Sequence, residues 1–230
     1  MKLNPRLKAI ADMVPPGSRI ADIGTDHGYL PVYLIKTGRA IGAVVTDVSR
    51  GSLSKAVELV EAMGLQDKVE TRLGNGLEVL KPGEVDTVII AGIGGVLIRN
   101  ILKDGAGVLE KAAKLLLQPM NAHEVVRKWL LENRFAIEDE CLVREKEKIY
   151  QVMAAVHGEQ KEDDSFYFEV GRRLIEKGDP LLPELARKKI KELSDIVSNL
   201  EDACTEEGQE RRRECLERIR RYREVMETCS

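Results

Sequence analysis

The sequence predicts an α/β fold, in which a mostly parallel β-sheet occupies about the first two thirds of the chain and an antiparallel helical hairpin follows it. From Arg19 to about Val156, short apolar runs alternate with helical patterns, an order that favours right-handed crossovers between parallel strands. Beyond about Gln160 no strand-like run occurs and the density of charge rises. We therefore expect two domains, residues 1–158 and 159–230.

Five short runs are predicted to be the parallel strands, because each ends at Gly, Pro or a polar residue that leads into a loop. The fourth, VDTVIIA, is almost wholly apolar, which is typical of a strand covered on both faces. The strands are expected at 19–23, 40–47, 69–73, 85–91 and 114–118, and the helices between them at 28–37, 49–63, 94–103 and 122–133.

The end of this region breaks the alternation. Residues 135–143 and 149–156 are extended runs joined by the charged turn 144–148, so they should pair as an antiparallel hairpin. Five parallel strands followed by an antiparallel pair are typical of the seven-stranded, Rossmann-like sheet of class I methyltransferases. A nicotinamide-dependent dehydrogenase would continue with another strand–helix unit.

The second region is predicted to be two short helices packed in a coiled-coil-like hairpin. Apolar residues recur at alternating steps of four and three, which places them on one side of each helix. A break at 178–180 precedes the first helix, and a loop is expected at 205–209. The seam consists of Ala186, Ile190, Leu193, Val197, Leu200 and Cys204, and then of Cys215, Ile219, Tyr222 and Met226.

The composition is that of a globular protein with a net charge of −3, which gives no support to broad binding of nucleic acid through total charge. The four cysteines form no CxxC pair and have no histidine at zinc-ligand spacing, so we expect reduced thiols and no metal. The sequence has no run typical of a signal peptide or a membrane span. We expect a cytoplasmic monomer that makes no membrane contact.

The strongest local signal is DIGTDHGYL, where the first strand ends and the first helix begins. Asp22 ends the strand, Gly24 lets backbone approach a ligand, and Gly28 opens a helix whose N–H groups can face an anion. Asp26 stands where a dinucleotide-binding motif has its second glycine, and it would repel a pyrophosphate. The motif therefore favours a nucleoside cofactor without phosphates, with a tight turn that binds nothing as the alternative.

Two further signals follow the second and third strands. Asp47, with Val48 beside it, lies where a carboxylate can accept hydrogen bonds from ribose hydroxyls. Ser49 suits the N-cap of the next helix better, which leaves Asp47 for a ligand. Asn75 can accept a hydrogen bond from an adenine amino group, although Asn75 and Gly76 also form a common turn pair.

The segment AGIGG follows the fourth strand and is poor in side chains. Ala91 and Gly92 are candidate cofactor contacts, while Gly94 and Gly95 would let a flat substrate approach the reactive methyl group. Gln118, after the fifth strand, would close the same cleft. All these positions lie at carboxyl ends of strands, where an open α/β sheet binds ligands, and together they predict an S-adenosylmethionine-dependent methyltransferase.

With these motifs in view, the chain resembles the TrmK family, the bacterial tRNA (adenine-22) N1-methyltransferases. The matching stretches are ADIGTDHGYLP, GNGLEV, IIAGIGGVLI and LLLQP. The resemblance covers nearly the whole chain, and the pairing of DIGTDHGYLP with AGIGG is specific to this group. Two positions depart from the family pattern: Asn75 replaces an expected Asp, and Met120 separates Pro119 from Asn121.

The resemblance implies transfer of a methyl group from S-adenosylmethionine to N1 of an adenine in tRNA. The N1 lone pair needs no base to start its attack, so catalysis would rest on positioning and electrostatics. Asp26 is the candidate for stabilising the cationic product and taking its proton. His27 and Tyr29 are candidates for holding or stacking on the base, with a helix-start role and a core role as their alternatives.

The resemblance also makes tRNA the partner, held by its shape and phosphates after the target base leaves its stack. Candidate contacts are three basic clusters: Lys2/Arg6/Lys8, residues 187–191, and Arg211, Arg212 and Arg213 with Arg218, Arg220, Arg221 and Arg223. Acidic residues are interleaved with the hairpin arginines, so a solvated helix face is the competing interpretation.

Three other functions stay open on the sequence alone. The chain could be a class I methyltransferase acting on a small molecule or a protein. It could be a non-catalytic RNA-binding protein that keeps the fold. A nicotinamide oxidoreductase is the third, and both Asp26 and the terminal strand hairpin disfavour it.

Overall fold

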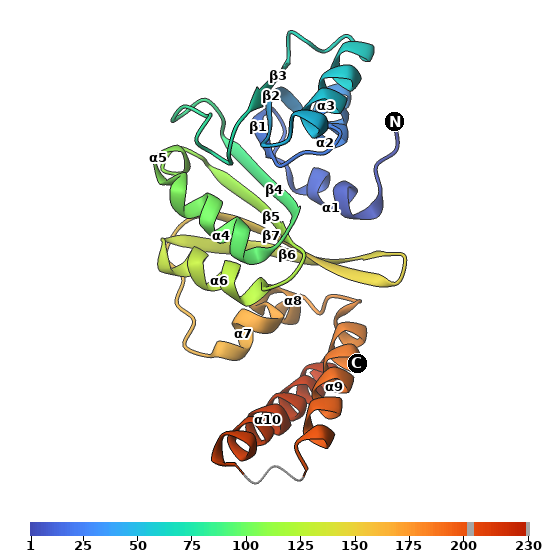
Figure 1. Ribbon diagram of the computed structural model, residues 1–230, viewed down its shortest axis with the longest axis vertical. Coiled ribbons are helices and arrows are strands. Elements are labelled where there is room, and N and C mark those ends of the chain that lie inside the picture. The colour runs from blue at the N-terminus through green and yellow to red at the C-terminus, as the bar shows by residue number, and fades with distance from the viewer. Residues whose placement is uncertain (202–204, 229–230) are drawn as a thin grey trace. The chain divides into compact units, whose positions relative to one another are not determined.

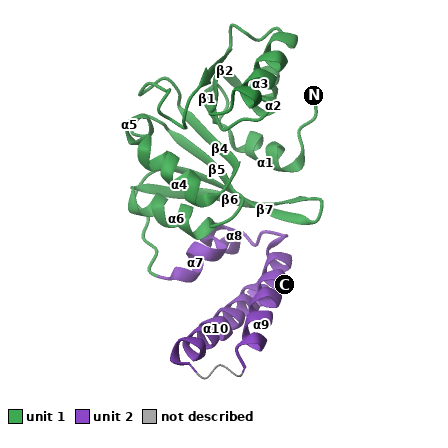
Figure 2. Ribbon diagram, viewed as in Figure 1, with its two compact units in different colours: residues 1–163 green, residues 164–230 purple. Residues whose placement is uncertain are grey.

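The computed structural model describes residues 1–201 and 205–228 (Figure 1). The chain divides into two compact units, 1–163 and 164–230 (Figure 2). Cys204, which was assigned to the hairpin seam, and Cys229, which was expected to be a reduced thiol, lie outside the described residues. Within the described ranges, no helix is both long and apolar enough to cross a membrane.

Unit 1 is built on a seven-stranded sheet with the strand order β3-β2-β1-β4-β5-β7-β6. Strands β1 to β5 are parallel, and β7 runs antiparallel to both of its neighbours. The predicted Rossmann-like sheet with a terminal antiparallel pair is therefore confirmed. The strands are β1 Ser18–Ile23, β2 Ala40–Asp47, β3 Val69–Leu73, β4 Thr87–Ile93, β5 Lys114–Pro119, β6 Phe135–Glu145 and β7 Lys148–His157.

Helices cover both faces of this sheet (Figure 1). Successive side chains of a strand point to opposite faces, so Ile89 of β4 packs in one apolar cluster and Ile90 in the other. This double burial explains why the fourth predicted strand is apolar throughout. One face carries α1 Pro5–Met13, α2 Tyr29–Lys36 and α3 Arg50–Ala62, and the other carries α4 Gly95–Asp104, α5 Ala106–Leu109 and α6 His123–Glu132.

Helix α1 has no counterpart among the predicted elements. Its start is well marked: Asn4 Oδ1 accepts a hydrogen bond from the Leu7 amide at 2.8 Å, and Pro5 occupies the first helical position. Ile10 and Ala11 are buried against the sheet. The helix thus adds cover to the α2/α3 face and carries its polar residues to the sheet edge.

Three of the predicted helices include their own capping residues at both ends, so the observed α2, α3 and α6 are each shorter by one residue at either end, whereas α4 is displaced by one residue from the predicted 94–103. Ser49 caps α3 as predicted, because its Oγ accepts from the Ser52 amide at 3.3 Å. The strands of the β-hairpin, by contrast, are longer than predicted. Strands β6 and β7 reach Glu145 and Lys148, so the turn is narrower than 144–148, and Lys146 takes a left-handed conformation with φ of 54°.

Unit 2 contains the predicted helical hairpin and two short helices that the sequence analysis did not predict. Helix α10 begins at Glu206, so the loop expected through Gln209 is wrong. Thr205 Oγ1 accepts from the Gly208 amide at 3.2 Å, which caps the helix. The elements are α7 Ser165–Val170, α8 Arg172–Glu176, α9 Leu182–Asn199 and α10 Glu206–Thr228, and the buried seam includes Ala186, Leu193, Val197, Cys215, Ile219 and Tyr222.

Candidate active site

The carboxyl ends of β1 to β5 lie along one rim of the sheet, and backbone hydrogen bonds join their loops. The Gly24 amide donates to the Thr46 carbonyl at 2.8 Å, and the Gly74 amide donates to the Asp47 carbonyl at 3.0 Å. We call the part after β1, β2 and β3 the acidic half; it carries Asp22, Asp26, Asp47 and Asn75. The part after β4 and β5 is the glycine half; it carries Gly92, Gly94, Gly95 and Gln118.

The β1–α2 turn depends on two glycines with positive φ. Gly24, with φ of 75°, is exposed, and within residues 1–201 and 205–228 no atom beyond its chain neighbours would lie within 4 Å of a Cβ built there, so the turn leaves open space for a ligand. Gly28 has φ of 68°, and a Cβ built on it would lie 3.2 Å from the Ala56 Cβ. In the described part of the chain no side chain caps α2, and the buried Gly28 amide at its start donates to Thr25 Oγ1 at 3.1 Å.

Asp22 is a buried carboxylate at the end of β1, only 6% exposed. Burial raises its pKa to about 6, with a smaller opposing effect from the hydrogen bond to Thr25 and a further rise from the nearby Asp47 charge. A buried anion next to another carboxylate is costly by itself, so this position suits a cationic ligand group.

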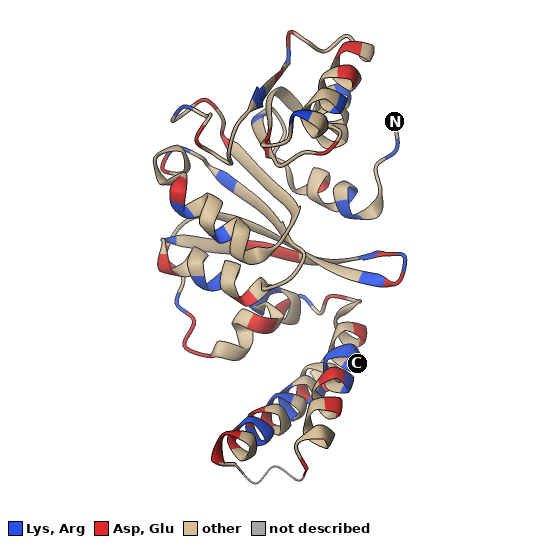
Figure 3. Cartoon of the chain, in the orientation of Figure 1, with Lys and Arg blue, Asp and Glu red and all other residues tan. Residues whose placement is uncertain are grey.

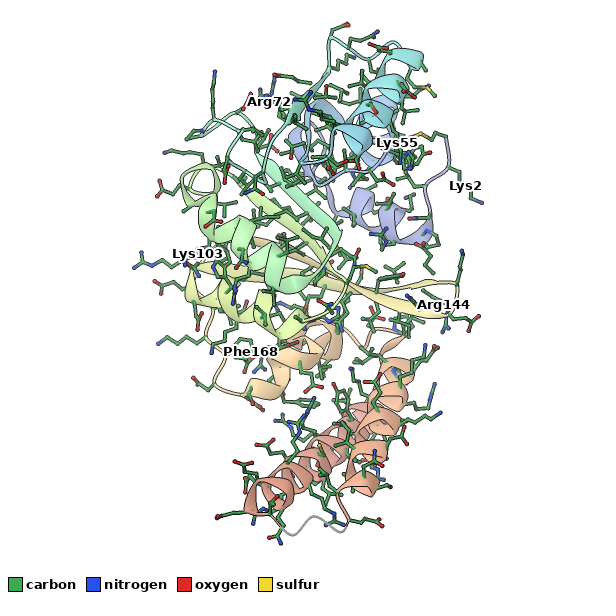
Figure 4. The ribbon with its side chains drawn as sticks, viewed as in Figure 1. Lys2, Lys55, Arg72, Lys103, Arg144 and Phe168 are labelled. Atoms are coloured by element: carbon green, nitrogen blue, oxygen red, sulfur yellow. The ribbon has the colours of Figure 1, made fainter. Side chains whose placement is uncertain are left out.

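Asp26, His27 and Tyr29 form an exposed cluster at the start of α2. Asp26 lies 3.1 Å from Lys55 Nζ and 3.1 Å from His27 Nε2, and the rings of His27 and Tyr29 stack with centroids 5.0 Å apart. The hydrogen bond from Lys55 is the main cause of a lowered Asp26 pKa. Lys55, labelled on α3 in Figure 4, was not among the predicted site residues, because no local motif connects it to Asp26.

Asp47 and Asn75 occupy the outer part of the acidic half. Asp47 Oδ1 accepts from the Ser49 amide at 2.6 Å, which directs the carboxylate at the loop while Ser49 itself caps α3. Val48 is 68% exposed, an apolar side chain open to solvent beside that carboxylate. Asn75 donates to Glu78 at 3.1 Å through its amide nitrogen, so its oxygen faces outward from that pair. Gly76 is buried, and a Cβ there would lie 3.0 Å from Ile101.

The glycine half is shaped mainly by backbone packing. A Cβ on Gly95 would lie 2.4 Å from the Ala122 carbonyl oxygen, so Gly95 is required by the close approach of the β5–α6 loop. Gly95 is buried, whereas Gly94 is half-buried and Gly92 is exposed with φ of 81°. Asn121 Oδ1 accepts from the Gly95 amide at 3.3 Å, a positioning contact that the sequence left open.

Gln118 is fully buried at the end of β5, next to Ala91 of β4 in the sheet register. Its Oε1 accepts a 2.6 Å hydrogen bond from Arg6 of α1, and its Nε2 donates to the Pro119 carbonyl at 2.8 Å. The side-chain oxygen and nitrogen of Gln118 therefore both bond to groups of the protein itself. Arg6 is the side chain that reaches the rim at the carboxyl end of β5. Arg6 and Gln118 are 112 residues apart in the sequence, so no local motif predicts their contact.

Basic and acidic residues are interleaved along the hairpin helices of unit 2 (Figure 3), and most arginines of α10 make ion pairs. Arg218 makes a two-pronged contact with Glu169 at 2.6 and 2.9 Å, and Arg211 lies 3.3 Å from Glu214. Arg212 is half-buried. The Arg218 contact ties α10 to α7, which gives this residue a structural role. Contact of these three arginines with tRNA stays a prediction.

Comparison with known proteins agrees with the site. The family described as a methyltransferase domain matches residues 3–153. The tRNA (adenine(22)-N(1))-methyltransferase of Bacillus subtilis strain 168 is 34% identical over 237 residues, which cover 99% of this chain and 98% of that protein. The match thus spans both units.

Solved structures give the same result. The Bacillus subtilis m1A22 tRNA methyltransferase TrmK has a TM-score of 0.91 at 33% identity, over 98% of this chain and 99% of that one. The Streptococcus pneumoniae protein Sp1610, in complex with S-adenosyl-L-methionine, has a TM-score of 0.88 at 30% identity, over 98% of this chain and 100% of that one. The rim of strand ends, the sheet topology and these whole-length similarities together show that the chain belongs to the TrmK family of tRNA (adenine(22)-N(1))-methyltransferases.

Proposed function

We propose that this protein transfers the methyl group of S-adenosylmethionine to N1 of adenine 22 in tRNA. The observation that carries the proposal is the rim itself, which joins an acidic half to a glycine half, in a chain similar to such an enzyme over 99% of its length. In this proposal unit 1 binds the cofactor and carries out the chemistry, in line with the expected catalytic domain of residues 1–158.

The acidic half fits the methyl donor. Asp22 suits the cationic ammonium of the methionine part, because an opposite charge offsets the cost of its buried carboxylate. Gly24 leaves room for the ligand backbone, and Asp47 is placed to accept hydrogen bonds from ribose hydroxyls. Val48 offers an apolar surface to the adenine ring, and the Asn75 oxygen is available to the adenine amino group, with Gly28, Gly76, Ala91 and Gly92 supplying backbone around them.

The residues of the chain act on the base mainly through electrostatics. When bound, the cofactor supplies an electrophilic methyl group. The N1 lone pair of adenine would form the new bond to the methyl carbon without a base, while the bond from that carbon to sulfur breaks and S-adenosylhomocysteine leaves. The ring is then cationic until a proton leaves the exocyclic amine. Asp26 keeps its carboxylate ionised because Lys55 lowers its pKa, so it suits stabilisation of that positive charge better than proton abstraction. His27 and Tyr29, stacked on each other, offer a flat surface to a base that has left its stack.

Mapping the methylated nucleoside tests this proposal. The full-length protein is incubated with S-adenosylmethionine and an unmodified tRNA transcript, and the digested RNA is analysed by mass spectrometry. The matched control is the same transcript with the adenine at position 22 replaced by guanine. We expect 1-methyladenosine at position 22 and no product from the control; a methyl group on another base, or on no base, contradicts the proposal.

A further inference from the structure

Arg6 brings a positive charge to the open end of β4. Its Nη1 donates to Gln118 Oε1, and a Cβ built on Gly92 would lie only 3.2 Å from the same nitrogen, so the guanidinium rests against the Gly92 backbone. We propose that Arg6 binds a backbone phosphate of the target nucleotide and so holds that nucleotide at the glycine half. This inference rests on the proposed function, because it assigns a contact within the same substrate site.

The Arg6 guanidinium keeps donors available for such a ligand. A guanidinium has five N–H donors, and among residues 1–201 and 205–228 its one hydrogen-bond acceptor is Gln118. The nearest carboxylate oxygen, from Glu145, lies 4.0 Å from Nε, beyond hydrogen-bond distance. The side chain is 20% exposed. A partly exposed guanidinium that makes one hydrogen bond, to a neutral amide, and has a carboxylate only at 4.0 Å keeps donors for an anion from outside the chain.

The guanidinium is also held in place before any ligand arrives. It lies over the Tyr150 ring of β7, with Cζ 5.5 Å from the ring centroid. Its acceptor, Gln118, is fully buried and fixed by the Pro119 carbonyl. Asn4 caps the helix that carries Arg6 and reaches toward Glu145 at 3.5 Å. Because the side chain is already ordered, less conformational entropy is lost when it binds.

The chemistry of the reaction favours a phosphate over the base as the ligand of Arg6. Methylation at N1 makes the adenine cationic, and a guanidinium touching the ring would oppose that charge. Phosphate oxygens match the planar fork of arginine and are bound through charge-assisted hydrogen bonds. Phosphate contacts position a nucleic acid rather than read its sequence, which is what a base taken out of its stack requires.

The test is the salt dependence of tRNA binding. Arg6→Gln removes the charge, and Arg6→Lys keeps it. Lys114→Gln is the matched control, because Lys114 is a similarly half-buried cation of unit 1 that pairs with Glu138 at 2.8 Å and lies at the amino end of β5, away from the rim. Dissociation constants for the unmodified transcript are measured with S-adenosylhomocysteine present, between about 50 and 200 mM salt. For Arg6→Gln we expect roughly tenfold or greater weakening at low salt and a slope of log K against log salt smaller in magnitude by about one.

Arg6→Lys should retain the wild-type slope, and Lys114→Gln should behave as wild type. The proposal is overturned if Arg6→Gln keeps the wild-type slope, or if Arg6→Lys loses as much as Arg6→Gln, since Arg6 would then only hold Gln118. Calorimetric titration of each variant with S-adenosylmethionine reports whether its cofactor site is intact. Failure of the proposed function is distinguishable, because it would appear as missing 1-methyladenosine from the wild-type protein.

Discussion

The two halves of the rim meet their ligands in different ways. The acidic half presents side chains that the fold itself leaves in costly or exposed positions, such as the buried Asp22 and the exposed Asp26. The glycine half uses its polar groups internally: Asn121 holds the Gly95 amide and Gln118 holds Arg6. In the proposed function, the acidic half offers individual charges to the cofactor and, through Asp26, to the base, whereas the shape of the glycine half is set by backbone packing.

The largest effect is expected at Asp26. Replacing it with Asn keeps its size but removes the negative charge that opposes the product cation, so kcat should fall roughly a hundredfold, the usual magnitude for one electrostatic contact. Binding of S-adenosylmethionine should change far less. Steady-state kinetics with an unmodified tRNA transcript measures both, with Asp12→Asn, an exposed acid paired with Lys8, as the control. Wild-type turnover in Asp26→Asn would remove this residue from the catalytic step.

A substitution in the glycine half should act on stability first. Gly95→Ala would place its methyl group 2.4 Å from the Ala122 carbonyl, a backbone atom that cannot move cheaply, so we expect a loss of about 2 kcal/mol. Denaturant unfolding measures this loss. Gly107→Ala is the matched control, because a Cβ at Gly107 in α5 meets nothing within 4 Å. Equal stability of the two variants would mean that the glycine half is not set by this contact.

The smallest effect is expected in the hairpin of unit 2. Arg211 lies beside Glu214, and a paired surface arginine has little net charge to offer a phosphate. Arg211→Gln should therefore change the tRNA dissociation constant by less than about twofold. Filter binding at low salt measures the change. A drop comparable to that of Arg6→Gln would place phosphate contacts on the hairpin as well.

The sequence predicts the sheet well, and with it the positions of Asp22 and Asp47 at strand ends, because both depend on local patterns. Apolar runs that end in Asp22 and Asp47 mark strands and their carboxyl ends directly, and Ser49 is a recognisable helix cap. The start of α1 also carries a local signal, Asn4 followed by Pro5. This helix was not predicted, because it precedes the first strand of the alternating pattern.

The glycine half was predicted less well, because it depends on contacts between distant segments. The glycines of AGIGG suggest an open slot, but Gly95 is buried against Ala122, and only the fold brings those two loops together. The contact between Arg6 and Gln118 is equally non-local. The start of α10 is a different case: Gly208 suggested a loop, although Thr205 and the acidic residues after it form a helix start.

Asp22 connects the stability of the protein to its ligand. Burial raises the pKa of the Asp22 carboxyl to about 6 in the folded protein, so the folded protein binds the carboxyl proton more tightly than the unfolded chain does. The resulting destabilisation, up to about 3 kcal/mol, is fully present above pH 6 and disappears as the pH falls toward 4. Asp22→Asn should therefore raise the stability of the ligand-free protein at pH 7 while weakening its binding of the cofactor.

Calorimetric titration with S-adenosylmethionine at pH 7 and pH 5, for the wild type and Asp22→Asn, tests most directly whether this buried carboxylate recognises the cofactor. Asp22 is largely protonated at pH 5, so the wild-type affinity should fall roughly tenfold between the two conditions, and the variant should bind weakly at both. A wild-type affinity that is equal at both pH values, or a variant that binds as tightly as the wild type, would contradict the account.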